Sequence, residues 1–268
     1  MAVLHLAADP AARLLTACCQ QWALKRSADF DAGFSMLILF SFGPAFGLPD
    51  PSPFVMKTEV QLQMSGLPYV RERAAPPAAP KGKVPFIEDR GFRIGDSTFI
   101  RAHLEEVHGV DLDAHLTAEQ KALAWAVERM LEDHLYFALL HARWIDDGNF
   151  AKGPALFFEG APDGVREAAR QRTRDYLQGQ GLGRHSPAEI AQLAAKDIAS
   201  LAAILGDKPY LIGEAPCGAD ATAFAMLAGV LTPHFDTPLR ATALDHPNLV
   251  AYRDRMMARF YPAFAGAA

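Results

Sequence analysis

The chain has 268 residues, of which 50% are apolar and 21% charged, and its formal net charge is −5. This composition is ordinary for a globular protein, and the length allows two domains with separate cores. A slightly acidic chain with scattered Lys and Arg gives no support for nucleic-acid binding. No apolar run reaches the roughly 18 residues that span a bilayer, so we expect no membrane span.

The three cysteines are Cys18, Cys19 and Cys217. They form neither a C-x-x-C pair nor a disulfide framework, so we expect a reducing, cytoplasmic location.

Residues 1–35 are rich in Ala and weakly patterned, unlike the rest of the chain. No basic segment precedes their apolar part, which argues against a secretory signal. Two interpretations remain open. The segment is either an appended helix over about 8–25, or the product of an upstream start in a working protein that begins at Met36. We favour the second.

The next 75 residues predict the order β-α-β-loop-β-β-α. Ser52 followed by Pro53 is typical of a helix N-cap, and Gly66 suits the end of that helix. A proline-rich loop at 74–80 replaces a second helix. The predicted strands are 36–42, 67–73, 84–88 and 92–94, and the second helix of this part is 97–108.

Everything after Asp111 is predicted to be helical. The capping boxes Thr117–Gln120 and Ser186–Glu189 begin two of the helices. We expect helices at about 117–144, 162–178, 186–206, 219–231 and 247–259.

The segment from Lys83 to Ile87 carries Pro85 inside an apolar strand, where a proline removes a ladder donor. A cis Val84–Pro85 bond accommodates it and leaves the backbone N–H and C=O of Val84 able to pair with an extended peptide. The helix that starts at Asp96-Ser97 offers N–H groups and a positive dipole end to a carboxylate. A ligand with a peptide backbone and a carboxylate, such as glutathione, fits this pattern.

These motifs together resemble the glutathione transferase superfamily, closest to the failed-axon-connections and metaxin-like branch and its bacterial relatives. The resemblance covers about 36–262. The residues that carry it are Gly82–Asp89, Asp96-Ser97, Glu132–Tyr136, Arg143-Trp144, Gln180–Ser186 and Ala219–Thr222.

The resemblance implies an α/β thioredoxin-like N-terminal domain at 36–110 and an all-α helical-bundle C-terminal domain at 111–268. It implies that Ser52 contacts the glutathione sulfur and that Val84 binds the cysteinyl unit, with Pro85 as the cis-proline. Asp96 and Ser97 then face the γ-glutamyl end, and Lys83 is a candidate for a glutathione carboxylate. Each of these polar residues also has a simpler interpretation. Ser52, Asp96 and Ser97 can be helix caps only, and Lys83 can be an exposed, solvated lysine.

Residues on the long predicted helix are candidates for the pocket of a second substrate. His134 and His141 lie seven residues apart on one helix face, with Met130 and Phe137 on the same side. An interhelical role for the histidines is the alternative. Glu132 and Asp133 do not lie on the helix face that carries His134 and His141, so we expect no metal site formed by these four residues.

The sequence therefore predicts a protein that binds glutathione as co-substrate and presents its thiolate to a small, apolar electrophile. The alternative is a non-catalytic binding or adaptor module with the same fold. A thiol–disulfide reductase is disfavoured because neither Ser52 nor Val55 is a cysteine. A homodimer is usual in the superfamily, but no interface is evident from the sequence.

Overall fold

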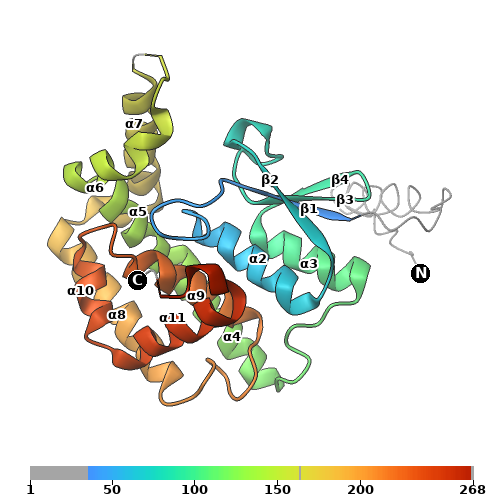
Figure 1. Ribbon diagram of the computed structural model, residues 1–268. Helices are drawn as coiled ribbons and strands as arrows, with labels where there is room; N and C mark the ends of the chain where they lie inside the picture. The colour runs from blue at the N-terminus through green and yellow to red at the C-terminus, as the bar shows by residue number, and fades with distance from the viewer. Residues whose placement is uncertain (1–35, 163, 267–268) are drawn as a thin grey trace, which may run out of the picture. The chain divides into compact units, whose positions relative to one another are not determined.

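The computed structural model describes residues 36–162 and 164–266, so the interpretations of 1–35 lie outside the described residues. Its first part is a four-stranded sheet in the order β2-β1-β3-β4 (Figure 1). β1 and β2 are parallel, and the β1–β3 and β3–β4 pairs are antiparallel. The strands are β1 (Leu37–Ser41), β2 (Tyr69–Arg73), β3 (Phe86–Asp89) and β4 (Phe92–Gly95). The predicted thioredoxin-like layout is confirmed.

Two helices, α2 (Pro53–Ser65) and α3 (Ser97–His108), cover one face of this sheet. One small apolar cluster joins them to the strands, made of Leu37, Leu39, Leu62, Ile87, Ile100 and Leu104. α2 ends at Gly66, whose φ of +70° is the left-handed conformation that glycine adopts without strain.

α2 is buried on both sides, and Figure 1 shows it between the sheet and α9. Its Met56 and Val60 belong to the core of the helical part, while Leu62 belongs to the sheet cluster. The polar residues Lys57 and Glu59 of α2 are consequently buried as well. α2 therefore joins the sheet to the helical part, and its buried polar side chains need hydrogen-bond or ion-pair partners inside the protein.

The helical part is built around α9 (Gly218–Leu231), in which every residue is buried. The other helices are α4 (Ala118–Met130), α5 (Tyr136–Trp144), α6 (Asp147–Lys152), α7 (Val165–Gln180), α8 (Pro187–Leu205), α10 (Pro238–Leu244) and α11 (Pro247–Phe260). None of the helices within the described ranges is long and apolar enough to cross a membrane.

Three details differ from the sequence prediction. The single helix expected at 117–144 is interrupted by a π-helical turn at Leu131–Leu135, where Glu132 turns into a buried ionic cluster. β3 begins at Phe86 rather than at residue 84, because Pro85 has no N–H for the ladder. The short helices α6 and α10 were not expected. The proline-rich segment is a loop as predicted, with one 3₁₀ turn at Pro76–Ala78.

Candidate functional site

Three segments with predicted ligand contacts leave the sheet at the same end. Phe86, at the start of β3, is paired with Phe40 near the end of β1 and with Gly95 at the end of β4. Val84–Pro85 immediately precedes Phe86, and Asp96–Ser97 immediately follows Gly95. The register therefore brings these two pairs to the edge at which β1 enters the loop that leads to Ser52.

Asp50 holds that loop in place. Its Oδ2 accepts hydrogen bonds from the backbone N–H groups of Phe42 and Gly43, both at 3.0 Å, and its Oδ1 accepts one from Ser52 N at 2.9 Å. Arg71 of β2 lies 3.4 Å from Oδ2. Burial raises the pKa of the Asp50 carboxyl to about 7, against the lowering effect of these partners. Asp50 thus fixes Ser52 next to the end of β1.

Ser52 is the N-cap of α2, and its Oγ accepts a hydrogen bond from Val55 N at 3.4 Å. This bond is long, and the side chain is only half-buried. The hydroxyl hydrogen is not used in that contact, because the oxygen is the acceptor. Ser52 can therefore act both as the helix cap, through its oxygen, and as a hydrogen-bond donor to a ligand at the N-terminus of α2, through its hydroxyl hydrogen.

The Val84–Pro85 bond is cis, as predicted. Val84 and Pro85 are buried, whereas Lys83 is exposed. Neither backbone group of Val84 hydrogen-bonds to another residue in the described part of the chain. This edge can accept an extended peptide in the manner of an added strand.

Asp96 has the backbone conformation φ 83°, ψ 124°, which is unfavourable for any residue with a Cβ. Its side chain is exposed and accepts a hydrogen bond from Thr98 N at 3.0 Å, which caps α3. Ser97 is the first residue of α3 and is buried. A non-glycine residue held in such a conformation costs about 1–3 kcal/mol and is typical of functional sites.

Arg143 of α5 places a buried positive charge beside this loop. Its Nη1 donates to the carbonyl of Pro51 at 3.1 Å and its Nη2 to the carbonyl of Gly229 at 2.7 Å. No carboxylate among the described residues forms an ion pair with it. Burial lowers the pKa of Arg143 to about 10, so the guanidinium remains charged at neutral pH.

A row of aromatic side chains, Phe54, Tyr136, Phe137 and Tyr176, forms an aromatic wall that begins at the start of α2. The ring of Phe54 lies 4.7 Å from that of Tyr136, Tyr136 lies 5.5 Å from Phe137, and Phe137 lies 5.3 Å from Tyr176 of α7. Lys83 Nζ lies 3.3 Å from the Tyr176 hydroxyl, which links this wall to the segment before Pro85. Burial raises the pKa of the Tyr136 hydroxyl to about 12. Tyr136 is therefore a neutral donor at physiological pH.

The predicted second-substrate residues do not all join this wall. Phe137 does, as described. His134 Nδ1 lies 2.5 Å from Asp197 Oδ2 of α8, which is the interhelical role considered for it. Met130 packs against the helical core. His141 is half-buried, and burial lowers its pKa.

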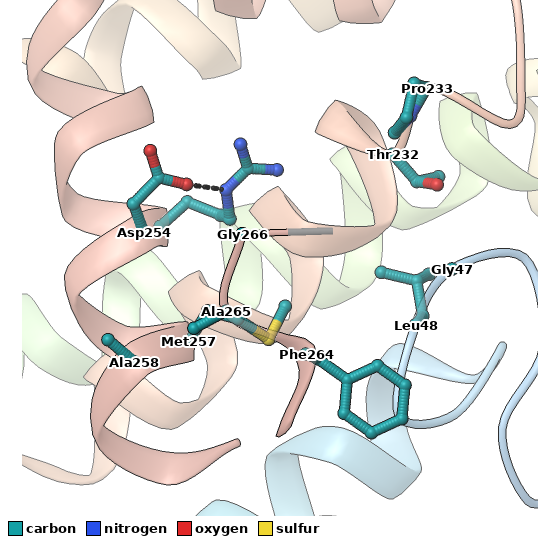
Figure 2. Close-up of a pocket in the computed structure, with 11 residues that line it drawn as sticks. Gly47, Leu48, Thr232, Pro233, Asp254, Met257, Ala258, Phe264, Ala265 and Gly266 are labelled. Atoms are coloured by element: carbon teal, nitrogen blue, oxygen red, sulfur yellow. Dashed lines mark hydrogen bonds and ion pairs between the residues drawn. The ribbon is translucent and has the colours of Figure 1, made fainter. Parts of the chain in front are cut away.

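A pocket of about 360 Å³ lies near the turn at Gly47–Leu48, the end of α9 and α11 (Figure 2). The C-terminal segment from Phe264 to Gly266 forms one side of it. Arg253 Nε lies 2.6 Å from Asp254 Oδ1. None of the site residues predicted from the sequence lines this pocket.

Sequence reasoning missed Asp50, the positioning role of Arg143 and a cluster of Asp89, His103 and His108. An Asp two residues before a Ser-Pro helix cap could have been read as a residue whose carboxylate accepts hydrogen bonds from the backbone of the preceding loop. Arg143 was noted only as part of the resemblance, and its contacts depend on tertiary packing. The two histidines lie five residues apart on α3, which is not a helical spacing typical of a shared ligand.

Family models match both parts of the chain. The glutathione S-transferase N-terminal domain matches residues 53–149, and the glutathione S-transferase C-terminal domain matches residues 194–256. Among solved structures, the beta-etherase LigF from Sphingobium sp. strain SYK-6 has a TM-score of 0.58 at 19% identity, covering 86% of this chain and 98% of that one. That likeness supports the fold.

Relatives of two kinds are similar to the chain in sequence. The isoprene-epoxide glutathione S-transferase of Rhodococcus sp. strain AD45 is 32% identical, with 84% of this chain and 99% of the relative covered. Failed axon connections of Drosophila melanogaster is 31% identical, with 85% and 58% covered. Human metaxin-1 is 26% identical, with 84% and 51% covered. Taken with the two domain matches and the fold, these similarities show that the chain belongs to the glutathione S-transferase superfamily.

Proposed function

We propose that this protein is an enzyme that binds glutathione at the end of the sheet formed by β1, β3 and β4, and transfers it to a small apolar electrophile. The observation that carries the proposal is the convergence at one end of the sheet of a capped helix N-terminus, a Val84 backbone that no described residue pairs, and a strained Asp96. In this arrangement Val84 pairs with the cysteinyl backbone, and Asp96 accepts from the α-amino group of the γ-glutamyl residue. A reducing cytoplasm is the compartment we propose, since it supplies glutathione.

Two features of the protein favour the thiolate form of the bound glutathione. The N-terminus of α2 carries a partial positive charge, and helix N-termini and nearby cations lower thiol pKa values. Ser52 supplies a hydroxyl donor at that terminus. Arg143 adds a charge that no carboxylate in the described ranges neutralises, held against the carbonyl that precedes Ser52.

The aromatic wall of Phe54, Tyr136, Phe137 and Tyr176 suits an apolar second substrate, and an epoxide is the class suggested by the Rhodococcus relative. The thiolate sulfur attacks an epoxide carbon, so that an S–C bond forms and the C–O bond breaks. The electron pair stays on the oxygen, which takes a proton from Tyr136. Solvent then restores that proton.

Glutathione consumption in the presence of a small epoxide tests the proposal. We expect saturable, enzyme-dependent loss of thiol and a thioether product of one glutathione and one epoxide. A protein that is retained on immobilised glutathione but forms no product with epoxides or aryl halides would contradict the catalytic part alone.

The role of Asp96 can be separated from its role as a helix cap. In Asp96→Gly the strain at φ 83° disappears, while a glycine N-cap costs only a few tenths of a kcal/mol. We expect an unchanged or higher melting temperature. Affinity for glutathione should fall by about 1.5–3 kcal/mol, roughly ten- to a hundredfold, because a hydrogen bond to a charged group is lost. Calorimetry measures the affinity, and equal affinity in the variant would reduce Asp96 to a cap.

Tyr136→Phe tests the proposed proton donor. With a pKa near 12, the hydroxyl is protonated throughout the neutral range, so its donation does not depend on pH there. We expect kcat with an epoxide to fall about tenfold or more, within the usual range for a positioned acid. Turnover of an aryl halide, whose leaving group needs no proton, should stay near that of the wild type. Tyr176→Phe is the matched control, and equal losses in both variants would argue for simple packing.

The second candidate is a non-catalytic binding module. It is favoured by the similarity to Failed axon connections and metaxin-1 over 85% and 84% of this chain. In that case a protein partner, rather than a small electrophile, occupies the aromatic wall. The retention and turnover assays above distinguish the two candidates.

A further inference from the structure

A buried carboxylate with two histidines lies at the opposite end of β3 from Val84–Pro85. Asp89, the last residue of β3, is 1% exposed. Nε2 of His103 and Nε2 of His108, both on α3, each lie 2.8 Å from the same oxygen, Oδ2 of Asp89. The three candidate ligand atoms lie within 4.8 Å of one another.

Hydrogen bonding within the cluster leaves one atom unexplained. Oδ1 of Asp89 is buried and accepts no hydrogen bond from a described residue. A buried carboxylate oxygen without a hydrogen-bond donor is costly, and such atoms commonly mark a water or an ion. A simple clamp, in which both histidines donate to Oδ2, does not account for it.

We propose that Asp89, His103 and His108 bind a divalent transition-metal ion, with Zn²⁺ as the best fit. Two imidazole nitrogens and one carboxylate are a common donor set for zinc, with a fourth position left for water. Zn–N bonds of about 2.0–2.1 Å in a tetrahedral site separate ligand atoms by roughly 3.3 Å. The present 2.8 Å separations therefore widen only slightly around an ion, and Oδ1 becomes a second metal or water ligand.

The surroundings allow entry of an ion. The two histidine side chains are 16% and 14% exposed, so the cluster opens to solvent on their side. Among the described lysines and arginines, Arg90 forms an ion pair with Asp89: its Nε lies 4.0 Å from Oδ1, and its side chain is 45% exposed. Arg90 opposes a divalent ion, so its removal is expected to strengthen binding. A bound metal would tie the end of α3 to the β3–β4 hairpin, far from the chemistry proposed for Ser52.

The experiment titrates Zn²⁺ and Co²⁺ into the metal-free full-length protein. Cys18→Ser and Cys19→Ser are present in every sample, so that thiolates outside the described residues cannot bind the ion. We expect one ion per chain by calorimetry, a rise of several degrees in melting temperature, and the visible absorption of four-coordinate Co²⁺.

Variants assign the site. His103→Asn and His108→Asn should each weaken binding by more than about a hundredfold and abolish the Co²⁺ spectrum, since loss of a direct ligand exceeds the effect of an outer-shell change. Arg90→Gly should tighten binding, and His134→Asn, a histidine in another Asp–His pair, should leave it unchanged. Asp89→Asn is informative only if it folds, so the histidine variants carry the test.

Two results would overturn the proposal. One is the absence of stoichiometric binding at micromolar metal. The other is binding that survives both histidine variants, which would place the ion elsewhere and leave the cluster as a hydrogen-bonded clamp. Neither result depends on glutathione.

Discussion

Lys57→Met is expected to destabilise the protein by about 3–5 kcal/mol, because it removes the buried cation that the carboxylates of Glu128 and Glu132 share. Lys57 Nζ lies 2.6 Å from Glu132 Oε1 and 3.3 Å from Glu128 Oε2, and its side chain is 1% exposed. The glutamate side chains are each 5% exposed. Methionine fills a similar volume, so the loss reports the charge rather than a cavity.

The cluster around Lys57 joins elements that are distant in sequence. Thr222 of α9 donates to Glu128 at 3.2 Å or Glu132 at 3.3 Å. Arg101 of α3 pairs with Glu128 at 3.2 Å, and Arg129 pairs with Glu132 at 2.8 Å. α2, α3, α4, the π-helical turn and α9 thus share one ionic network at the boundary of the sheet and the helical part. Removing its central cation affects all five elements.

Denaturant unfolding measures this effect, with Lys121→Met as the control. Lys121 pairs with Asp111 at 3.5 Å, but both side chains are about half-exposed. An exposed pair of this kind contributes at most about 1 kcal/mol. A loss below about 1 kcal/mol in Lys57→Met, or equal losses in both variants, would show that the network does not hold the two parts together.

Ser52→Ala is expected to lower turnover roughly ten- to a hundredfold, by removing a charge-assisted hydrogen bond to the glutathione sulfur worth about 1.5–3 kcal/mol. The variant also loses a helix cap, worth about 1 kcal/mol of stability. Ser186→Ala is the matched control, because Ser186 caps α8 and is exposed. It should lose similar stability and no activity.

Ser52→Cys should change the chemistry instead. A thiol at the N-terminus of α2 is in the setting that lowers cysteine pKa values and makes the sulfur nucleophilic. We expect this variant to gain glutathione-dependent reduction of small disulfides while it loses conjugation. If Ser52→Ala conjugates like the wild type and Ser52→Cys gains nothing, Ser52 is only a cap.

Local signals predicted much of the first part of the fold. The Ser52-Pro53 cap and Gly66 mark the two ends of α2, because capping depends on neighbouring residues and not on distant partners. The π-helical turn at Leu131–Leu135 was not predictable, because the charged Glu132 enters a network supplied by α2 and α9. Hydrophobic periodicity alone continues the helix through this turn.

The sequence predicted those site residues whose role depends on local backbone conformation. It did not predict those whose role depends on contacts with distant parts of the chain. Val84–Pro85 and Asp96–Ser97 stand out in the sequence because proline and capping residues have narrow uses. Two other contacts form only when distant segments fold together. One is the hydrogen bond from Arg143 to the carbonyl of Pro51, and the other is the hydrogen bonding of His103 and His108 to Asp89. Asp50 lies between these cases, since its backbone donors are within eight residues, whereas Arg71 reaches it from β2.

The most direct measurement is the pH titration of the thiol of bound glutathione, followed by the ultraviolet absorbance of the thiolate. Free thiols of this kind titrate near pH 8.5, and sulfur at a helix N-terminus beside a cation titrates at least about one unit lower. We expect such a lowered value in the wild-type protein and a return toward the free value in Ser52→Ala. Glutathione that fails to bind, or that binds with the pKa of the free thiol, would contradict the account.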